Sequence, residues 1–161
     1  MARSIGASLP DHVFALLRGD NLRAHIGLTL LLLSETEDGW PHLALLSIGE
    51  VLALSPDRLR LALWPQSTAT ANLTRRGRAT LALVHEAASY SVRLSAERGE
   101  DLSVSNDYEL ATFDAQVTEV FEDVAPYAPL TSGITYQLHD PEAVLARWEK
   151  TLRALRVPKT G

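Results

Sequence analysis

The sequence has no cysteine. A disulfide framework and a thiolate metal site are therefore both excluded. The five histidines are scattered along the chain and do not stand at metal-ligand spacings such as HxxxH, so we predict no metal site. Basic side chains are also scarce, since 15 Lys and Arg against 20 Asp and Glu give a net charge of -5. Such a chain has no field to attract nucleic-acid phosphates or an anionic membrane, and we predict neither as a partner.

Long hydrophobic runs are missing as well. The most apolar run, Ile26 to Leu33, is about half of the roughly 20 residues that a membrane-spanning helix needs. The first residues do not form a basic start followed by an unbroken apolar core, because Pro10, Asp11 and His12 interrupt it, so we predict a cytoplasmic protein. No Gly-x-Ser-x-Gly elbow, P-loop or GxGxxG occurs, which disfavours a hydrolase, an NTPase and a Rossmann dehydrogenase.

The residues that are present favour one β-rich domain spanning 1–161. With 161 residues and 46% hydrophobic side chains, the chain can bury one substantial core. Alternation and turn residues predict strands at 26–33, 41–47, 50–54, 59–64, 79–84, 90–95, 108–121 and 134–138. Helices are expected to begin at Ser8-Leu9-Pro10-Asp11, where Ser8 can cap, near Ser67, and at Asp140. The polar stretch from Glu97 to Asp107 is expected to be a loop. Successive short hairpins favour a mainly β fold, a closed antiparallel barrel with flanking helices, because closure removes exposed edges.

The clearest alternation lies between Tyr108 and Phe121. Ala111, Phe113, Ala115, Val117 and Phe121 are expected to share the apolar face of one long strand, opposite a polar face.

The turn Trp64-Pro65-Gln66-Ser67-Thr68 is the segment best suited to bind an anion. A short helix fits between this turn and Gly77, and the first amides of a helix are unpaired and carry partial positive charge. Ser67, Thr68 and Thr70 add hydroxyls there, and Asn72 adds an amide one turn later. The alternative is that Ser67 or Thr68 merely caps the helix, as such residues commonly do.

Several segments, in this order, resemble the FMN-binding split barrels related to pyridoxamine 5'-phosphate oxidase. They are Gly39-Trp40-Pro41-His42, Leu61 to Trp64 followed by Ser67 to Leu73, Arg78 to Val84, Phe113 to Asp123, Thr131 to Tyr136, and Arg147-Trp148-Glu149. The resemblance runs from about Leu22 to Arg156. It implies a six-stranded split barrel that forms a homodimer, with FMN at the subunit interface.

The resemblance also implies roles for individual residues. The flavin ring would lie along Leu43 to Ser47, with Leu45, Leu46 and Ser47 facing it through backbone groups. Ala62, Leu63 and Trp64 would line the ring or the ribityl chain, Ser67 and Thr68 would contact the phosphate, and Thr70 and Asn72 would assist. The implied activity is that of a flavin-dependent oxidoreductase acting on a small-molecule substrate that the sequence does not identify.

The sequence departs from the family at the phosphate. Ser47, Thr68 and Ala69 stand where pyridoxamine phosphate oxidases carry basic side chains, and a charge-assisted hydrogen bond is roughly twice as strong as a neutral one. Arg60, Arg75, Arg78 and Arg93 are the candidates to replace that charge. This departure leaves two alternatives open: a non-catalytic split-barrel dimer that acts as a binding or structural module, and a relative that binds a deazaflavin or haem.

Overall fold

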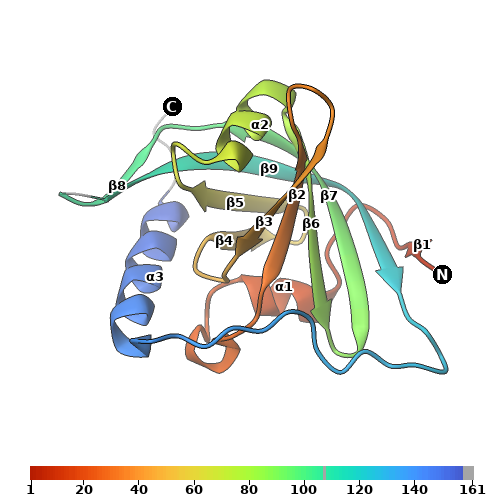
Figure 1. The fold of residues 1–161 in the computed structure, drawn as a ribbon. Helices are drawn as coiled ribbons and strands as arrows, with labels where there is room; N and C mark the ends of the chain where they lie inside the picture. The colour runs from red at the N-terminus through yellow and green to blue at the C-terminus, as the bar shows by residue number, and fades with distance from the viewer. Residues whose placement is uncertain (107, 158–161) are drawn as a thin grey trace.

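The chain folds around one antiparallel sheet with helices at its periphery (Figure 1). The computed structural model describes residues 1–106 and 108–157, and in this part of the chain it has nine strands, three α-helices and one short 3-10 helix at Arg23–His25. The strands are β1 Arg3–Ser4, β2 Leu30–Glu35, β3 Pro41–Leu46, β4 Val51–Ser55, β5 Arg58–Leu63, β6 Arg78–His85, β7 Ala88–Arg98, β8 Leu102–Ser105 and β9 Tyr108–Asp123. The helices are α1 Asp11–Leu17, α2 Thr68–Arg76 and α3 Pro141–Arg156.

The mainly β class with flanking helices is confirmed, but the expectation of a closed six-stranded barrel is wrong. Neighbouring strands follow the order β3-β2-β6-β7-β9-β5-β4, and β1 and β8 also pair with β9. The path is open, with β3 at one end and β4 at the other. Residues of β3 and β5 line a cavity between these two strands.

The core lies inside the curved sheet and under α1 and α3. Inward-facing residues alternate along the strands and are almost fully buried, among them Leu30, Leu32, Leu61, Leu81, Val92 and Phe113. Helix α1 packs on β4 through Val13, Leu16 and Leu17. Helix α3 packs on β4 and β5 through Leu145, Trp148, Leu152 and Leu155. The Gly49 turn between β3 and β4 runs so close to α3 that a Cβ on Gly49 would lie 2.1 Å from Trp148 Cγ.

Strand β9 contains a bulge that the alternation did not predict. Arg93 pairs with Glu119 but Leu94 pairs with Val117, so Thr118 is an extra residue on β9. An extra residue reverses the alternation beyond it. Val120 is therefore fully buried, and Phe121, which was expected on the buried face, is only half-buried, with the Arg93 guanidinium 4.7 Å from its ring centre.

Three other expectations about elements need correction. The stretch expected to be a loop from Glu97 contains the end of β7 and all of β8, whose edge pairs with the start of β9, while Asp107 lies outside the described residues. The first long strand begins at Leu30 and not at Ile26, because a 3-10 turn and the positive φ of Gly27 precede it. The strand expected at 134–138 is reduced to a single bridge between Leu28 and Thr135.

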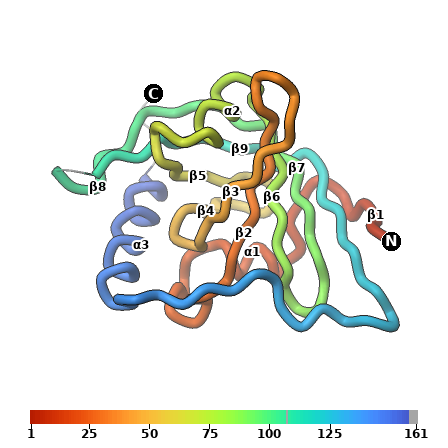
Figure 2. Tube along the Cα trace, in the orientation of Figure 1, coloured from red at the N-terminus to blue at the C-terminus, as the bar shows by residue number. Residues whose placement is uncertain are grey.

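The segment from 124 to 140 runs along the ends of β7, β6 and β2 before it enters α3 (Figure 2). Its backbone is attached at two points: the Leu130 amide donates to the Ala87 carbonyl, and the Tyr136 amide donates to the Gly27 carbonyl. These attachments bring Ile134 and Tyr136 beside β3. No helix among the described residues is long and apolar enough to cross a membrane.

Candidate functional site

A cavity of about 180 Å³ lies between β3 and β5, and we call it the β3–β5 slot. Six of the ten residues proposed from the sequence line it: Leu45, Leu46, Ala62, Leu63, Trp64 and Ser67. Three strands and the start of α2 contribute the walls, since His42 and Ala44 come from β3 and Tyr108 and Leu110 from β9. The structure thus brings together segments that are well separated in the sequence.

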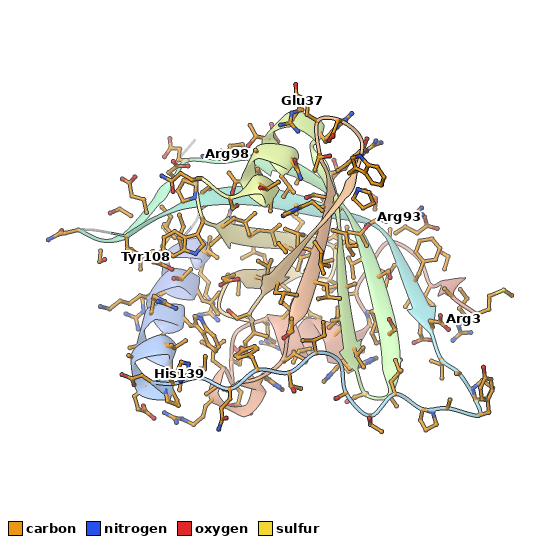
Figure 3. The ribbon with its side chains drawn as sticks, in the orientation of Figure 1. Arg3, Glu37, Arg93, Arg98, Tyr108 and His139 are labelled. Carbon is orange, nitrogen blue, oxygen red and sulfur yellow. The ribbon has the colours of Figure 1, made fainter. Side chains whose placement is uncertain are left out.

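The slot is open and apolar because β3 is an edge strand. Leu43 and Leu45 point outward and are 51% and 58% exposed, while Leu46 turns inward. Trp64, directly after β5, is 55% exposed and stands edge-on to Tyr108, with 4.9 Å between the ring centres. Figure 3 shows Tyr108 at the end of the sheet next to α3. A flat apolar ligand fits between such side chains with few polar contacts.

The hydroxyls at the start of α2 are engaged within the protein. Ser67 Oγ accepts a hydrogen bond from the Thr70 amide at 3.1 Å and caps the helix, so the capping alternative is confirmed for Ser67. The Thr70 hydroxyl is buried and donates to the Trp64 carbonyl at 2.7 Å. Thr68 is exposed at the first turn, where helix amides have no intrahelical partner. Thr68 is therefore the hydroxyl of this turn best placed to meet a ligand.

Asn72 has a structural role in this fold. Its side chain is buried, its Nδ2 donates to Ser34 Oγ on β2 at 3.0 Å, and its Oδ1 accepts from Arg75 at 3.3 Å. Asn72, Thr68 and Thr70 do not line the β3–β5 slot.

Each arginine considered as a replacement for the missing phosphate charge has a partner elsewhere. Arg60 pairs with Asp114, Arg78 with Glu35 and Arg93 with Glu119, and Arg75 donates to Asn72. Among the residues that line the slot, His42 is the only one with a basic side chain. The phosphate end of the slot thus depends on backbone amides and hydroxyls.

A second cavity of about 370 Å³, here the α3 cavity, adjoins the slot. It lies between the end of β3, the segment before α3, and α3 itself. Ser47, which directly follows β3 and was also proposed for the cofactor, lines it, and Leu45, Leu46 and Glu50 line both cavities. The slot and the α3 cavity therefore meet at Glu50.

Glu50 is the residue that sequence reasoning missed. Its Oε2 accepts a hydrogen bond from the Ser47 amide at 3.1 Å. Burial raises the pKa of Glu50 to about 7, because a carboxylate loses hydration there, and the Ser47 amide and the Arg147 charge oppose this shift only in part. The available signal was an acid placed directly before the buried run Val51 to Ala53.

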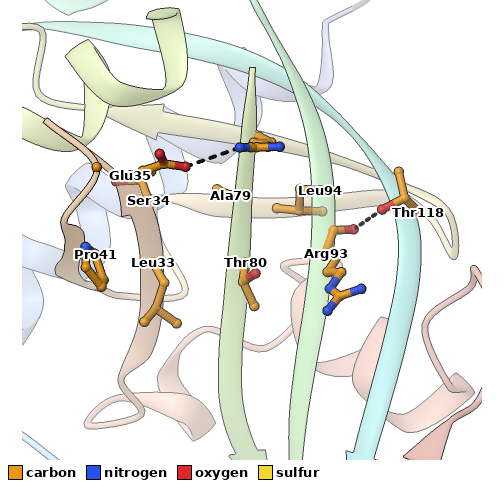
Figure 4. Close-up of a pocket in the computed structure, with 11 residues that line it drawn as sticks. Leu33, Ser34, Glu35, Pro41, Ala79, Thr80, Arg93, Leu94 and Thr118 are labelled. Carbon is orange, nitrogen blue, oxygen red and sulfur yellow. Dashed lines mark hydrogen bonds and ion pairs between the residues drawn. The ribbon is translucent and has the colours of Figure 1, made fainter. Parts of the chain in front are cut away.

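Another large hollow, of about 560 Å³, lies across the outer face of β2, β6 and β7 and reaches β9 at Thr118 (Figure 4). Its charged residues are already paired, with Arg78 bound to Glu35 at 3.2 Å and Arg93 bound to Glu119 at 3.1 Å. None of the residues proposed for the cofactor lines it. Within the described residues, no three His, Asp or Glu side chains are arranged to hold a metal ion.

Comparison with solved structures defines the fold class. A candidate pyridoxamine 5'-phosphate oxidase of Lactobacillus delbrueckii superimposes with a TM-score of 0.57 at 18% identity, covering 74% of this chain and 98% of that one. HupZ of Group A Streptococcus superimposes with a TM-score of 0.55 at 11% identity, covering 80% of this chain and all of that one, 100%. The fold is the split barrel of proteins related to pyridoxamine 5'-phosphate oxidase.

A closer relative comes from sequence. The uncharacterized protein YclD of Bacillus subtilis (strain 168) is 41% identical over 148 residues, which cover 92% of this chain and 96% of YclD. The chain therefore belongs to the YclD family of split-barrel proteins. No family model matches the chain.

Proposed function

We propose that this protein binds FMN in the β3–β5 slot and acts as a flavin-dependent oxidoreductase on a small molecule. The observation that carries the proposal is the convergence of Leu45, Leu46, Ala62, Leu63, Trp64 and Ser67 on one cavity. The family resemblance assigns these same positions to the cofactor, and they come from three parts of the chain. The fold class supports the same reading.

The residues present fit the flavin ring and the ribityl chain of the cofactor better than they fit its phosphate. The exposed apolar face of β3 suits the flavin ring, and Ala62 to Trp64 suit the ring edge or ribityl chain. At the phosphate, the first amides of α2 and the Thr68 hydroxyl are the available donors, because no Arg or Lys lines the slot. Bound FMN would supply the electron transfer, and the chain would orient it and exclude water. We expect weaker phosphate binding than a basic site gives.

A homodimer is part of the proposal. Leu43, Leu45 and Ile134 are each more than half exposed and lie on or beside edge strand β3. An exposed apolar edge strand is an aggregation hazard unless another surface covers it. A second copy would cover this strand and close the open side of the slot.

FMN titration tests the proposal. We expect purified protein to quench FMN fluorescence at a saturable 1:1 ratio per chain. Trp64→Ala removes an aromatic wall of the slot and should weaken FMN binding by about tenfold. Trp40→Ala is the matched control, because Trp40 is 70% exposed and does not line the slot. Saturable binding of haem or a deazaflavin without binding of FMN contradicts the FMN assignment, and binding of none of the three favours a non-catalytic module.

A further inference from the structure

Glu50 lies where the proposed cofactor slot ends and the α3 cavity begins. Its backbone is fixed on both sides, since its amide donates to the Ser47 carbonyl and its carbonyl accepts from the Ala62 amide. One carboxyl oxygen is held by the Ser47 amide at 3.1 Å. A protonated carboxyl in this position keeps an O–H to donate to a ligand in the α3 cavity.

Arg147 brings a positive charge to the same cavity. It lies on α3, its guanidinium is 5.6 Å from the ring centre of Tyr108, and it lines the α3 cavity. Among the described residues, Arg147 makes no ion pair and no side-chain hydrogen bond. Every other arginine discussed above is paired. An unpaired guanidinium beside an apolar cavity is a binding point for a carboxylate or a similar anion.

The remaining walls of the α3 cavity are mainly apolar. Leu46, Ile134, Leu138, Val144 and Trp148 surround it, with the hydroxyls of Thr29 and Ser47 between them. The Tyr136 hydroxyl is buried at the wall without a hydrogen-bond partner in the described chain. Burial raises the pKa of this phenol, and the backbone of Gly27 opposes the shift only in part. Such walls favour a compact apolar body and leave few places for polar groups.

We propose that the α3 cavity is the substrate site and that it takes a small organic monoanion with an apolar body, which accepts a hydrogen bond from protonated Glu50 and contacts the Arg147 guanidinium. This inference rests on the proposed function, because it names the substrate class for the same site. It assigns Glu50 and Arg147 to substrate binding and leaves the redox chemistry to the cofactor.

The proposal predicts a pH dependence with a definite sign. The titratable groups that face Glu50 are Arg147 from α3, Tyr108 from β9, Tyr136 from the segment before α3, and His42 from β3. Burial raises the pKa of both tyrosines, so they stay neutral, and Arg147 stays charged. A bound organic anion and an ionised Glu50 carboxylate would repel each other, so binding of the anion requires Glu50 to be protonated. Affinity should be constant below about pH 7 and fall up to about tenfold per pH unit above it.

The test uses FMN-loaded protein and three matched probes: cyclohexanecarboxylate, cyclohexanecarboxamide and cyclohexylmethylamine. Binding is measured by calorimetry from pH 6 to pH 9, and FMN affinity is measured separately by fluorescence on each variant. We expect the carboxylate alone to bind. Arg147→Gln should weaken it by about tenfold or more, while Arg153→Gln, an exposed arginine of α3 outside the cavity, should not. Glu50→Gln, which can still accept from Ser47, should bind similarly at pH 6 and lose the pH dependence.

The outcomes separate this inference from the proposed function. Equal binding of the acid and the amide, or a pH dependence unchanged in Glu50→Gln, would overturn the inference. Weaker FMN binding in Arg147→Gln with unchanged carboxylate binding would assign Arg147 to the cofactor and also overturn it. If the fluorescence titration shows no FMN binding, the same calorimetry is done on the FMN-free protein. Carboxylate binding that depends on Glu50 and Arg147 there would support the anion site and contradict the FMN function.

Discussion

Arg60 on β5 forms an ion pair with Asp114 on β9, with 2.7 Å between Nε and Oδ1, and the same guanidinium donates to the Leu155 carbonyl near the end of α3 at 2.6 Å. One side chain thus connects two strands and the last helix. The Arg60 side chain is 12% exposed. Its position explains why it is unable to serve a phosphate in the β3–β5 slot.

Arg60→Met should destabilise the protein by about 3 kcal/mol, because it leaves Asp114 partly buried without this cation and frees carbonyls at the end of α3. Arg23→Met is the control, since the Arg23–Glu142 pair is exposed at 63% and 74% and should contribute less than about 1 kcal/mol. Urea unfolding measures both variants. Equal losses would contradict the structural role of Arg60.

Ser67→Ala and Thr68→Ala should separate stability from cofactor binding. Ser67→Ala removes the cap of α2 and should cost about 1 kcal/mol in the free energy of unfolding. Thr68 is exposed and does not cap the helix, so Thr68→Ala should leave unfolding unchanged and weaken FMN binding. Thermal unfolding and FMN titration on both variants check this. Unchanged FMN affinity in both variants would contradict the assignment of this turn as the phosphate-binding site.

Gly49→Ala should be strongly destabilising, by about 3 kcal/mol, because its Cβ would overlap the buried indole of Trp148. Gly133→Ala provides the comparison, since its Cβ would meet only Val84 at 3.3 Å. A loss of less than about 1 kcal/mol for Gly49→Ala would mean that α3 moves away freely. Urea unfolding of both variants, followed by far-UV circular dichroism, measures the two losses.

The pKa of Glu50 predicts that stability falls as pH rises. Folding raises this pKa from 4.5 to about 7, so the folded state holds the proton more tightly than the unfolded chain. The stabilisation is complete below about pH 4.5 and is lost as the pH rises through 7, and the two limits differ by roughly 3 kcal/mol. Unfolding free energies at pH 5 and pH 8 should differ by less in Glu50→Gln than in the natural protein. An equal difference in both would assign the titration to another group.

Leu43→Asp should produce monomers. Leu43 is exposed on the outer face of edge strand β3, and an ionised carboxylate there would oppose burial against a second copy. Val124→Asp, at another exposed apolar position after β9, is the control. Light scattering after gel filtration gives the mass. A monomeric natural protein, or a dimer in both variants, would contradict an interface on β3.

The sequence predicted the parts of this fold that depend on local signals. Ser67 and Gly77 define α2 because a cap and a left-handed glycine act within a few residues. Along β3, the less exposed His42, Ala44 and Leu46 alternate with the exposed Leu43 and Leu45, as the period of two in a strand requires. The bulge at Thr118 was missed because it depends on the register between β7 and β9, which no local pattern records.

The sequence predicted the site residues that lie on strands. It missed the residues that come together through packing between distant segments. The slot residues of β3 and β5 were placed by their segments, whereas Asn72 and Thr70 were assigned to a ligand although partners within the fold engage both. Glu50 and Arg147 come together only when α3 docks on the Gly49 turn. This proximity depends on tertiary packing, so the spacing of the two residues in the sequence does not indicate it.

Strand β9 pairs with β1, β5, β7 and β8. Until residues 108–123 leave the ribosome, no strand is available to join the β4–β5 hairpin to the β3-β2-β6-β7 part of the sheet. Each piece has a free edge, β5 in one and β7 in the other, and a free edge can pair with a neighbouring chain. Productive folding therefore requires β9, which is synthesised late. A ribosome that stalls before Tyr108 would carry a nascent chain prone to aggregate.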